Sequence, residues 1–180
     1  DLSSMGTDRK WVKVKDIIFP YINFKTTILQ EVKKEFEQLL LHLGSTFEKE
    51  IVFGGIETTF GLGGLHGSVK NKKVISDDDY IIKSCDVVSY YPNLAIRNKL
   101  HPQHIPQEIF CNLYEGLFNE RRSIPKSDPR NYVLKIALNA LYGLTNDKFS
   151  FLRDRQFTVA ICVNGQLLLS MLAEELLLEI

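Results

Sequence analysis

The sequence has too few cysteines, too widely spaced, for a disulfide-stapled or zinc-stapled scaffold. Its 180 residues include three cysteines, Cys85, Cys111 and Cys162, and no Cys-x-x-Cys pair. An odd number of widely separated cysteines indicates free thiols in a reducing compartment, and the missing pair argues against a structural zinc site.

The formal net charge is zero, and we expect neither a signal peptide nor a membrane-spanning segment. Lysine plus arginine and aspartate plus glutamate number 22 each, so whole-chain charge neither favours nor excludes a nucleic-acid partner. The sequence does not begin like a signal peptide, and no apolar run reaches the roughly 20 residues of a membrane span. With 44% hydrophobic residues and no repeats, the chain predicts one globular domain or two small subdomains.

Both ends of the sequence lack terminal signals. The first residue is Asp1, and the apolar pattern that ends at Ile180 has no glycine, proline or basic cap. We therefore expect an internal piece of a longer protein. The alternative is a native C-terminus at the end of a helix that has no capping residue.

Hydrophobic periodicity and turn residues predict an α+β chain. In the first half, a helix is expected to end at Gly44, and a strand to lead from the acidic run Asp77–Asp79 to Asp86. The expected elements of this half are a helix over 28–44, two short strands at 50–55 and 57–60, a glycine-rich stretch at 61–67 and a buried strand over 80–88.

The second half reads as helical. Asp128 and Pro129 suit the start of a helix, and Gly143 suits its end. Asn164-Gly165 is expected to interrupt the last helix. The expected helices cover 94–99, 105–124, 127–143 and most of 154–180.

Two of these helices concentrate positive charge. The helices at 105–124 and 127–143 are joined by about three residues, so they should form an antiparallel hairpin. A phosphate-rich ligand is the natural partner of such a face, the alternative being a solvated surface. The cations are Arg121, Arg122, Lys126, Arg130 and Lys135, and a polar stripe on the second helix holds Asn131, Lys135, Asn139 and Tyr142.

Asp86 stands at the end of the expected strand, directly before Ser89, two tyrosines and Pro92. A carboxylate in this place can hold a hard cation such as Mg²⁺, and the amides that follow can contact phosphate oxygens. The alternative is an aspartate that caps a short helix at 90–92.

Three short motifs in order resemble those of family B DNA polymerases. DVVSYYPN (86–93) resembles the family's first motif, of Asp, two residues, Ser, a large residue, Tyr and Pro. KIALNALYG (135–143) resembles the second motif, with Ala140 in place of the commoner serine, and RSIPK (122–126) resembles the Arg-x3-Lys element before it. The general similarity is to enzymes of bacterial viruses or mobile elements.

This resemblance implies a polymerase palm, a partial sheet with packed helices, and a helical-hairpin fingers subdomain. The implied division is 1–104 for the N-terminal region and first part of the palm, 105–144 for the fingers and 145–180 for a further palm helix. The family's third motif, Asp-Thr-Asp, does not occur, so we expect it after Ile180 and expect this chain alone to be inactive.

The resemblance also implies a reaction: deoxynucleotides added to a primer 3′-hydroxyl with two Mg²⁺ ions. Asp86 and Lys135 would be catalytic, and Asp86 with the Val87 carbonyl would bind metal. Tyr91 would lie beneath the incoming sugar and exclude a 2′-hydroxyl. The implied nucleotide-binding residues are Val87, Ser89, Tyr90, Tyr91, Arg122, Lys126, Lys135, Asn139 and Tyr142.

The implied partners are primer–template DNA, deoxynucleoside triphosphates and the rest of a polymerase chain, with exonuclease, remaining palm and thumb, in the cytoplasm or nucleoid and without a membrane. The alternative is a non-catalytic module that binds nucleic acid or nucleotides. Asp86 discriminates between the two, because a pure binder has no use for a buried carboxylate that faces phosphate.

Overall fold

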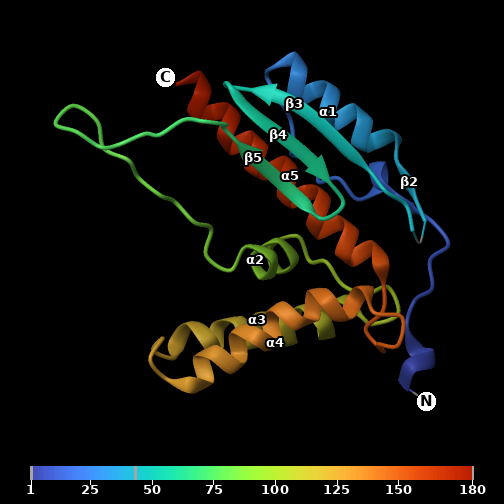
Figure 1. The fold of residues 1–180 in the computed structure, drawn as a ribbon. Helices are drawn as coiled ribbons and strands as arrows, with labels where there is room; N and C mark the ends of the chain where they lie inside the picture. The colour runs from blue at the N-terminus through green and yellow to red at the C-terminus, as the bar shows by residue number, and fades with distance from the viewer. Residues whose placement is uncertain (1, 43, 180) are drawn as a thin grey trace.

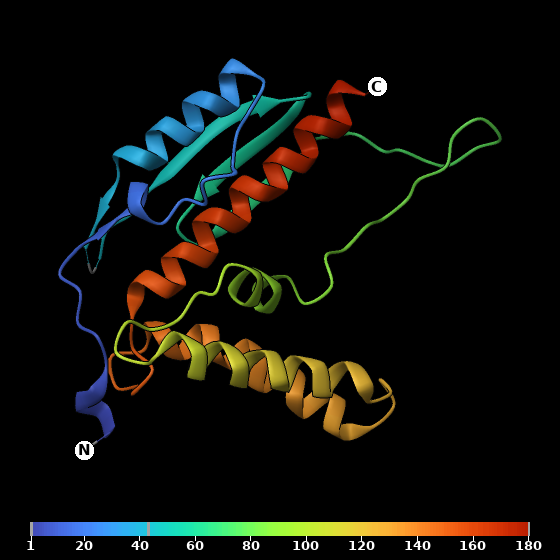
Figure 2. The ribbon, with the colours of Figure 1, turned by 180° about the vertical axis from the view of Figure 1, so that it is seen from behind.

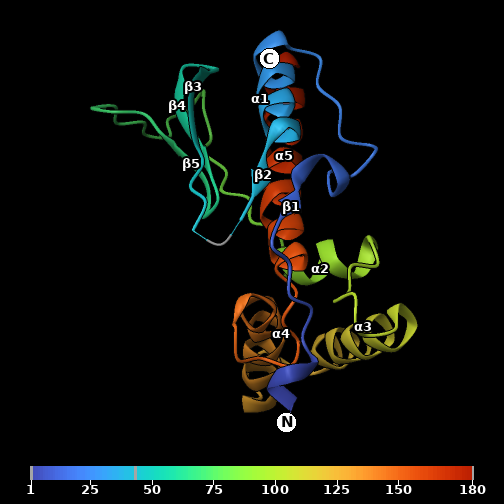
Figure 3. The same ribbon diagram turned by 90° about the vertical axis from the view of Figure 1, so that its right-hand side faces the viewer.

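A 24-residue helix, α5 (Arg155–Leu178), forms the spine of the structure. The computed structural model describes residues 2–42 and 44–179, which fold into a mixed α+β arrangement of helices and two small antiparallel sheets. Helix α1 (Thr27–Gln38) runs along α5, and the larger sheet flanks them (Figures 1 and 3). Further helices lie below, near the beginning of α5 (Figure 3).

The larger sheet is a meander of three antiparallel strands, in the order β3-β4-β5. Gly54 and Gly55 both have positive φ, 59° and 77°, and form the tight turn between the first two strands, where glycine avoids a steric cost. The two short strands expected here are confirmed, whereas the glycine-rich stretch proves to be the second turn and a third strand. The strands are β3 (Glu48–Phe53), β4 (Ile56–Gly61) and β5 (Gly64–Ser68).

The smaller sheet explains why α1 ends early. Gln38 is the last helical residue, and Leu39 is already extended. The next two residues form β2 (Leu40–Leu41), which pairs with β1 (Val12–Lys13). The prediction of a helix capped by Gly44 was therefore wrong at its end, because pairing with a distant strand outweighed helical periodicity; Leu43 lies outside the described residues.

Polar side chains buried on α5 tie the flanking segments to it. The Asn164 side chain accepts a hydrogen bond from the Phe19 amide at 2.8 Å and donates one to the Ile17 carbonyl at 2.8 Å. Gln166 makes both types of bond with the Gly61 backbone, at 3.1 and 2.8 Å. The predicted interruption at Asn164-Gly165 was wrong, because these tertiary bonds satisfy Asn164 within a continuous helix.

Helices α3 (Gln107–Ser123) and α4 (Pro129–Asn146) form the expected antiparallel hairpin. Tyr114 is 2% exposed and its hydroxyl donates to the Leu138 carbonyl at 3.0 Å. The Asp128 cap is confirmed, since its side chain accepts from the Arg130 amide. The end predicted at Gly143 was wrong, because α4 continues through it by a further turn.

The strand expected over 80–88 does not form. These residues carry no strand, and large side chains such as Ile81 and Val88 are 79% and 76% exposed. Asp86 is likewise exposed rather than buried. β-Branched residues favour strands only where a neighbouring strand pairs with them, and among the described residues none does. Figures 1 and 2 show the connection between β5 and α2 arching away from the helices, with this segment in the part that returns to α2 (Tyr90–Arg97), which begins earlier than expected.

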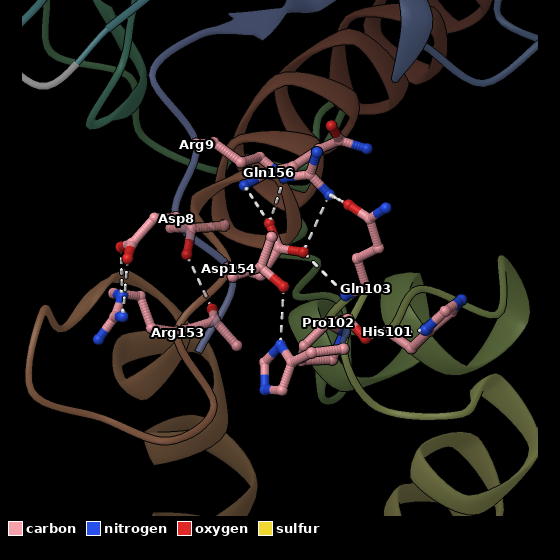
Figure 4. A network of polar contacts seen from close by, with 12 residues as sticks. Asp8, Arg9, His101, Pro102, Gln103, Arg153, Asp154 and Gln156 are labelled. Atoms are coloured by element: carbon pink, nitrogen blue, oxygen red, sulfur yellow. Dashed lines mark hydrogen bonds and ion pairs between the residues drawn. The ribbon is translucent and has the colours of Figure 1, made fainter. Parts of the chain in front are cut away.

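The beginning of α5 is held by a polar network around Asp154 (Figure 4). Asp154 is 1% exposed and caps the helix by accepting from the Gln156 amide at 3.1 Å. It also accepts from Arg9 Nε at 2.6 Å and from the Gln103 amide at 2.8 Å. Three segments far apart in the sequence are thereby joined at one buried carboxylate.

By length and composition, α5 could cross a membrane, which corrects the expectation that no apolar run is long enough. The mean hydropathy of its most apolar 18-residue stretch is 1.5, and 67% of that stretch is buried within the fold. The mostly buried core helix of a soluble protein meets the same criteria of length and hydropathy.

Candidate functional site

A cavity of about 600 Å³ lies between the first turn of α2 and the α3–α4 hairpin. It is lined by side chains from three separate parts of the sequence, which the fold brings together. The lining residues are Asp86, Val88, Ser89, Tyr90, Tyr91, Pro92, Arg121, Lys126, Asn131, Tyr132, Lys135 and Asn139.

The floor of this cavity is a strained turn at Ser89. Its backbone is left-handed, with φ 50° and ψ 52°, a conformation that costs a non-glycine residue energy. Ser89 stands at the N-cap of α2 but makes no capping bond with its side chain, whose oxygen accepts from Arg121 Nη1 at 3.0 Å. The Asn93 side chain braces the same turn by donating to the Val88 carbonyl at 2.9 Å.

The two tyrosines of the turn have different surroundings. The Tyr90 hydroxyl donates to the Gly165 carbonyl of α5 at 2.6 Å, and burial raises its pKa to about 12. The Tyr91 ring packs against Tyr142 with centroids 4.8 Å apart. The Tyr142 hydroxyl lies 2.7 Å from Cys162 Sγ, and burial raises the pKa of both groups, so both stay protonated at neutral pH.

The α3–α4 hairpin and its connection contribute positive charge to the lining of the cavity. Arg121, Lys126 and Lys135 line the cavity, whereas Asp86 is the one carboxylate among the lining residues. Lys126 and Lys135 are exposed and therefore hydrated, so their charges act through solvent. Three cations beside one carboxylate, with the first amides of a helix at the floor, favour an anionic ligand.

Seven of the ten residues proposed from the sequence line this cavity: Asp86, Ser89, Tyr90, Tyr91, Lys126, Lys135 and Asn139. Val87, Arg122 and Tyr142 do not. Val87 is 42% exposed on the irregular segment, and Tyr142 lies behind Tyr91. The Arg122 guanidinium lies 5.8 Å from the centre of the Phe118 ring and borders a smaller neighbouring cavity.

Sequence reasoning had given no individual role to Arg121 or Asn131. Asn131 is 9% exposed and donates to the carbonyls of Arg121 and Ile124, at 3.1 and 2.8 Å, which fixes the connection of the hairpin. Arg121 had been counted among the cations of the hairpin, but only the fold shows that it reaches Ser89.

The described residues do not form a complete metal site. They include no group of three or more histidine, cysteine, aspartate or glutamate side chains suited to a metal ion. Mg²⁺ is commonly bound through one or two carboxylates together with substrate phosphates. Asp86 therefore fits as one ligand of an ion that arrives with a nucleotide, and this part of the chain offers no second.

Comparison with known proteins adds no relative: no family model, curated protein or solved structure matches the chain. The cavity and the motifs that border it are therefore the features of the chain that bear on its function.

Proposed function

We propose that this chain carries the nucleotide-binding part of a DNA-directed DNA polymerase, which adds deoxynucleotides to a primer 3′-hydroxyl. The observation that supports the proposal most is the convergence of two motifs on one cavity. Ser89 and Tyr91 of the first motif line the same cavity as Lys135 and Asn139 of the second, although the whole of α3 separates them in sequence.

The chemistry of the cavity suits a triphosphate. The first residues of any helix have amides without intrahelical partners, and at α2 these belong to Tyr90 and Tyr91. Lys126 and Lys135, from the hairpin connection and α4, add positive charge to the lining of the cavity. Asn139 and Tyr91 both line the cavity. In the proposed function, Asn139 would hydrogen-bond the nucleotide, and the Tyr91 ring would offer a flat apolar surface to its sugar.

In this proposal, α2 and α5 belong to the palm, and the α3–α4 hairpin is the fingers. The proposed cofactor is Mg²⁺, which would supply charge neutralisation at the reacting phosphorus, as metal ions do in phosphoryl transfer. Asp86 is the residue of this chain that would contact it. The chain's own contribution is to bind and orient the triphosphate, because positioning is a large part of catalysis in this class of reaction.

Nucleotide titrations and primer extension test the proposal. The purified chain should bind dATP with Mg²⁺ at low ionic strength, as measured by calorimetry, and should bind deoxyadenosine much more weakly. It should extend no primer, because among the described residues only Asp86 lines the cavity as a carboxylate. Equal affinity for dATP and deoxyadenosine would refute a triphosphate site.

One observation favours the alternative, a non-catalytic binding module: Asp86 lies on an exposed irregular segment rather than at a buried strand end. The variant Asp86→Asn separates the two. In a polymerase site it should remove the part of dATP affinity that depends on Mg²⁺. In a plain anion-binding module it should strengthen dATP binding with or without Mg²⁺, because a repelling charge is gone.

A further inference from the structure

The contact between Arg121 and Ser89 joins the hairpin to the floor of the cavity. Arg121 is the third-last residue of α3, and Ser89 immediately precedes α2. Their side chains meet at 3.0 Å, between Arg121 Nη1 and Ser89 Oγ. Arg121 Nε also points to Asn131 Oδ1 of α4, at a longer 3.4 Å. One guanidinium of α3 thus contacts both the turn at Ser89 and the first part of α4.

The left-handed conformation of Ser89 has a steric cost. Only glycine enters the left-handed region without a steric cost, and the other residues that do so persist where their surroundings hold them. Asn93 braces the turn from its own helix, through the carbonyls of Val88 and Ser89. Arg121 is the brace that comes from the hairpin, and it bonds the side-chain oxygen of Ser89, which makes no capping bond to α2.

That occupation has a consequence for the amides of the turn. A serine at an N-cap usually turns its hydroxyl onto the free amides of the first turn. Here the hydroxyl is held by Arg121 instead, and the third helical residue is Pro92, which has no amide hydrogen. The Tyr90 and Tyr91 amides are therefore left available for an anion in the cavity.

We propose that Arg121 is a positioning residue: by holding Ser89 in the left-handed conformation, it keeps the amides of Tyr90 and Tyr91 open to the phosphates of a nucleotide. The binding consequence rests on the proposed function, whereas the effect on the turn does not. The role differs from that of Lys126 and Lys135, which contribute charge, because removal of Arg121 should change the backbone of another element.

Nuclear magnetic resonance of the ligand-free chain tests the effect on the turn. A residue with positive φ gives a strong cross-relaxation signal between its own amide and Hα protons. This signal should be strong at Ser89 and weak in Arg121→Met, with the Tyr90 and Tyr91 amide resonances shifted. Arg97→Met, on the exposed last turn of α2, is the matched control and should leave all of them unchanged.

Calorimetry with inorganic tripolyphosphate tests the binding consequence. Arg121→Met should weaken binding about tenfold, the scale of about 1.4 kcal/mol. Adding Ser89→Gly should recover at least about threefold of that loss, because glycine adopts the left-handed conformation without a brace. A residue that acted through charge alone would show no such rescue, since glycine restores no charge.

The outcomes are distinct. A strong Ser89 signal retained in Arg121→Met, or no rescue by Ser89→Gly, would overturn the positioning role. If Arg121→Met lost its cooperative melting transition, Ser89→Ala would serve as the test variant, because it removes the hydrogen-bond acceptor while Arg121 stays. A strong amide–Hα signal retained at residue 89 of Ser89→Ala would also overturn the positioning role. Failure of the unmodified chain to bind tripolyphosphate would count against the proposed function, while the resonance comparison would still decide the role of Arg121.

Discussion

Replacement of Glu174 should destabilise the chain far more than replacement of its neighbour Glu175. Glu174 is 1% exposed on α5, and its carboxylate accepts from the amides of Lys25 and Thr26, at 2.9 and 2.8 Å, and from the Thr26 hydroxyl at 2.5 Å. It therefore caps α1 from another element, and Thr26 makes no capping bond of its own.

The magnitude follows from the groups that Glu174→Ala would leave without partners. Two amides at about 1–2 kcal/mol each give a loss of about 2–4 kcal/mol. A Thr26 hydroxyl that turned to cap its own helix would restore about 1 kcal/mol. The net loss of about 1–3 kcal/mol corresponds to a melting midpoint lower by roughly 2–12 °C for a chain of this size.

The pH dependence has a definite sign. Burial by itself would raise the pKa of Glu174, but the hydrogen bonds from Thr26 and Lys25 favour the charged form, and the pKa is lowered overall. A carboxyl whose folded pKa lies below its unfolded value of about 4.3 stabilises the fold above that value. The stability difference between the unmodified chain and Glu174→Gln should hold at neutral pH and shrink as pH falls through the folded pKa.

Urea denaturation and thermal melting measure both effects, with Glu175→Ala as the control. Glu175 forms an exposed ion pair with Lys25, so its loss should move the midpoint by no more than roughly 1 °C. Equal losses in the two variants, or a difference independent of pH between 3 and 7, would show that Glu174 does not cap α1.

Three further predictions concern the cavity and the core. Lys135→Ala should weaken dATP binding about tenfold at low salt and less at high salt, because the lysine is exposed; a larger loss of duplex DNA affinity would make it a DNA-backbone contact instead. Tyr91→Ala should reduce the preference for dATP over ATP by about tenfold, since it removes a steric clash with the 2′-hydroxyl. Tyr90→Ala should lower the melting midpoint and leave that preference unchanged. Calorimetric titrations of both variants with dATP and ATP test this, and a changed preference in Tyr90→Ala alone would reverse the assignment. Asn164→Leu should cost about 2–3 kcal/mol in urea denaturation, because it leaves the Phe19 amide buried without its partner; a loss below about 1 kcal/mol would contradict that role.

Local signals in the sequence predicted the hairpin well. The Asp128 cap, the proline after it and the short connection between 105–124 and 127–143 all act within a few residues, and the structure confirms the helices they predict. The two strands either side of Gly54 and Gly55 are confirmed for the same reason. Such elements depend on capping, turn geometry and periodicity, which a sequence displays directly.

The failures share a different cause, which is dependence on distant partners. The residues over 80–88 have the composition of a strand but no neighbour to pair with. Asn164-Gly165 looks like a break, yet Asn164 finds its partners at Ile17 and Phe19. The left-handed conformation of Ser89 and its contact with Arg121 gave no local signal either. Serine, unlike glycine and asparagine, is not enriched at positive φ.

The same distinction separates the two halves of the candidate site. Ser89 accepts a hydrogen bond from Arg121, and Tyr90 donates one to Gly165, so the half of the site that is proposed to contact phosphate is bonded to other elements of the fold. Asp86, by contrast, lies on an exposed segment, and within residues 2–42 and 44–179 its side chain takes part in no hydrogen bond or ion pair. Substitution of Asp86 should therefore leave triphosphate affinity without Mg²⁺ largely unchanged. The same substitution should remove the increase in affinity that Mg²⁺ causes. A polymerase needs both halves in a fixed relative position. Catalysis by paired metal ions requires the carboxylate at a set distance from the reacting phosphorus. If the proposed function holds, the placement of the segment over 80–88, which carries Asp86, would therefore distinguish a catalytic site from a binding site.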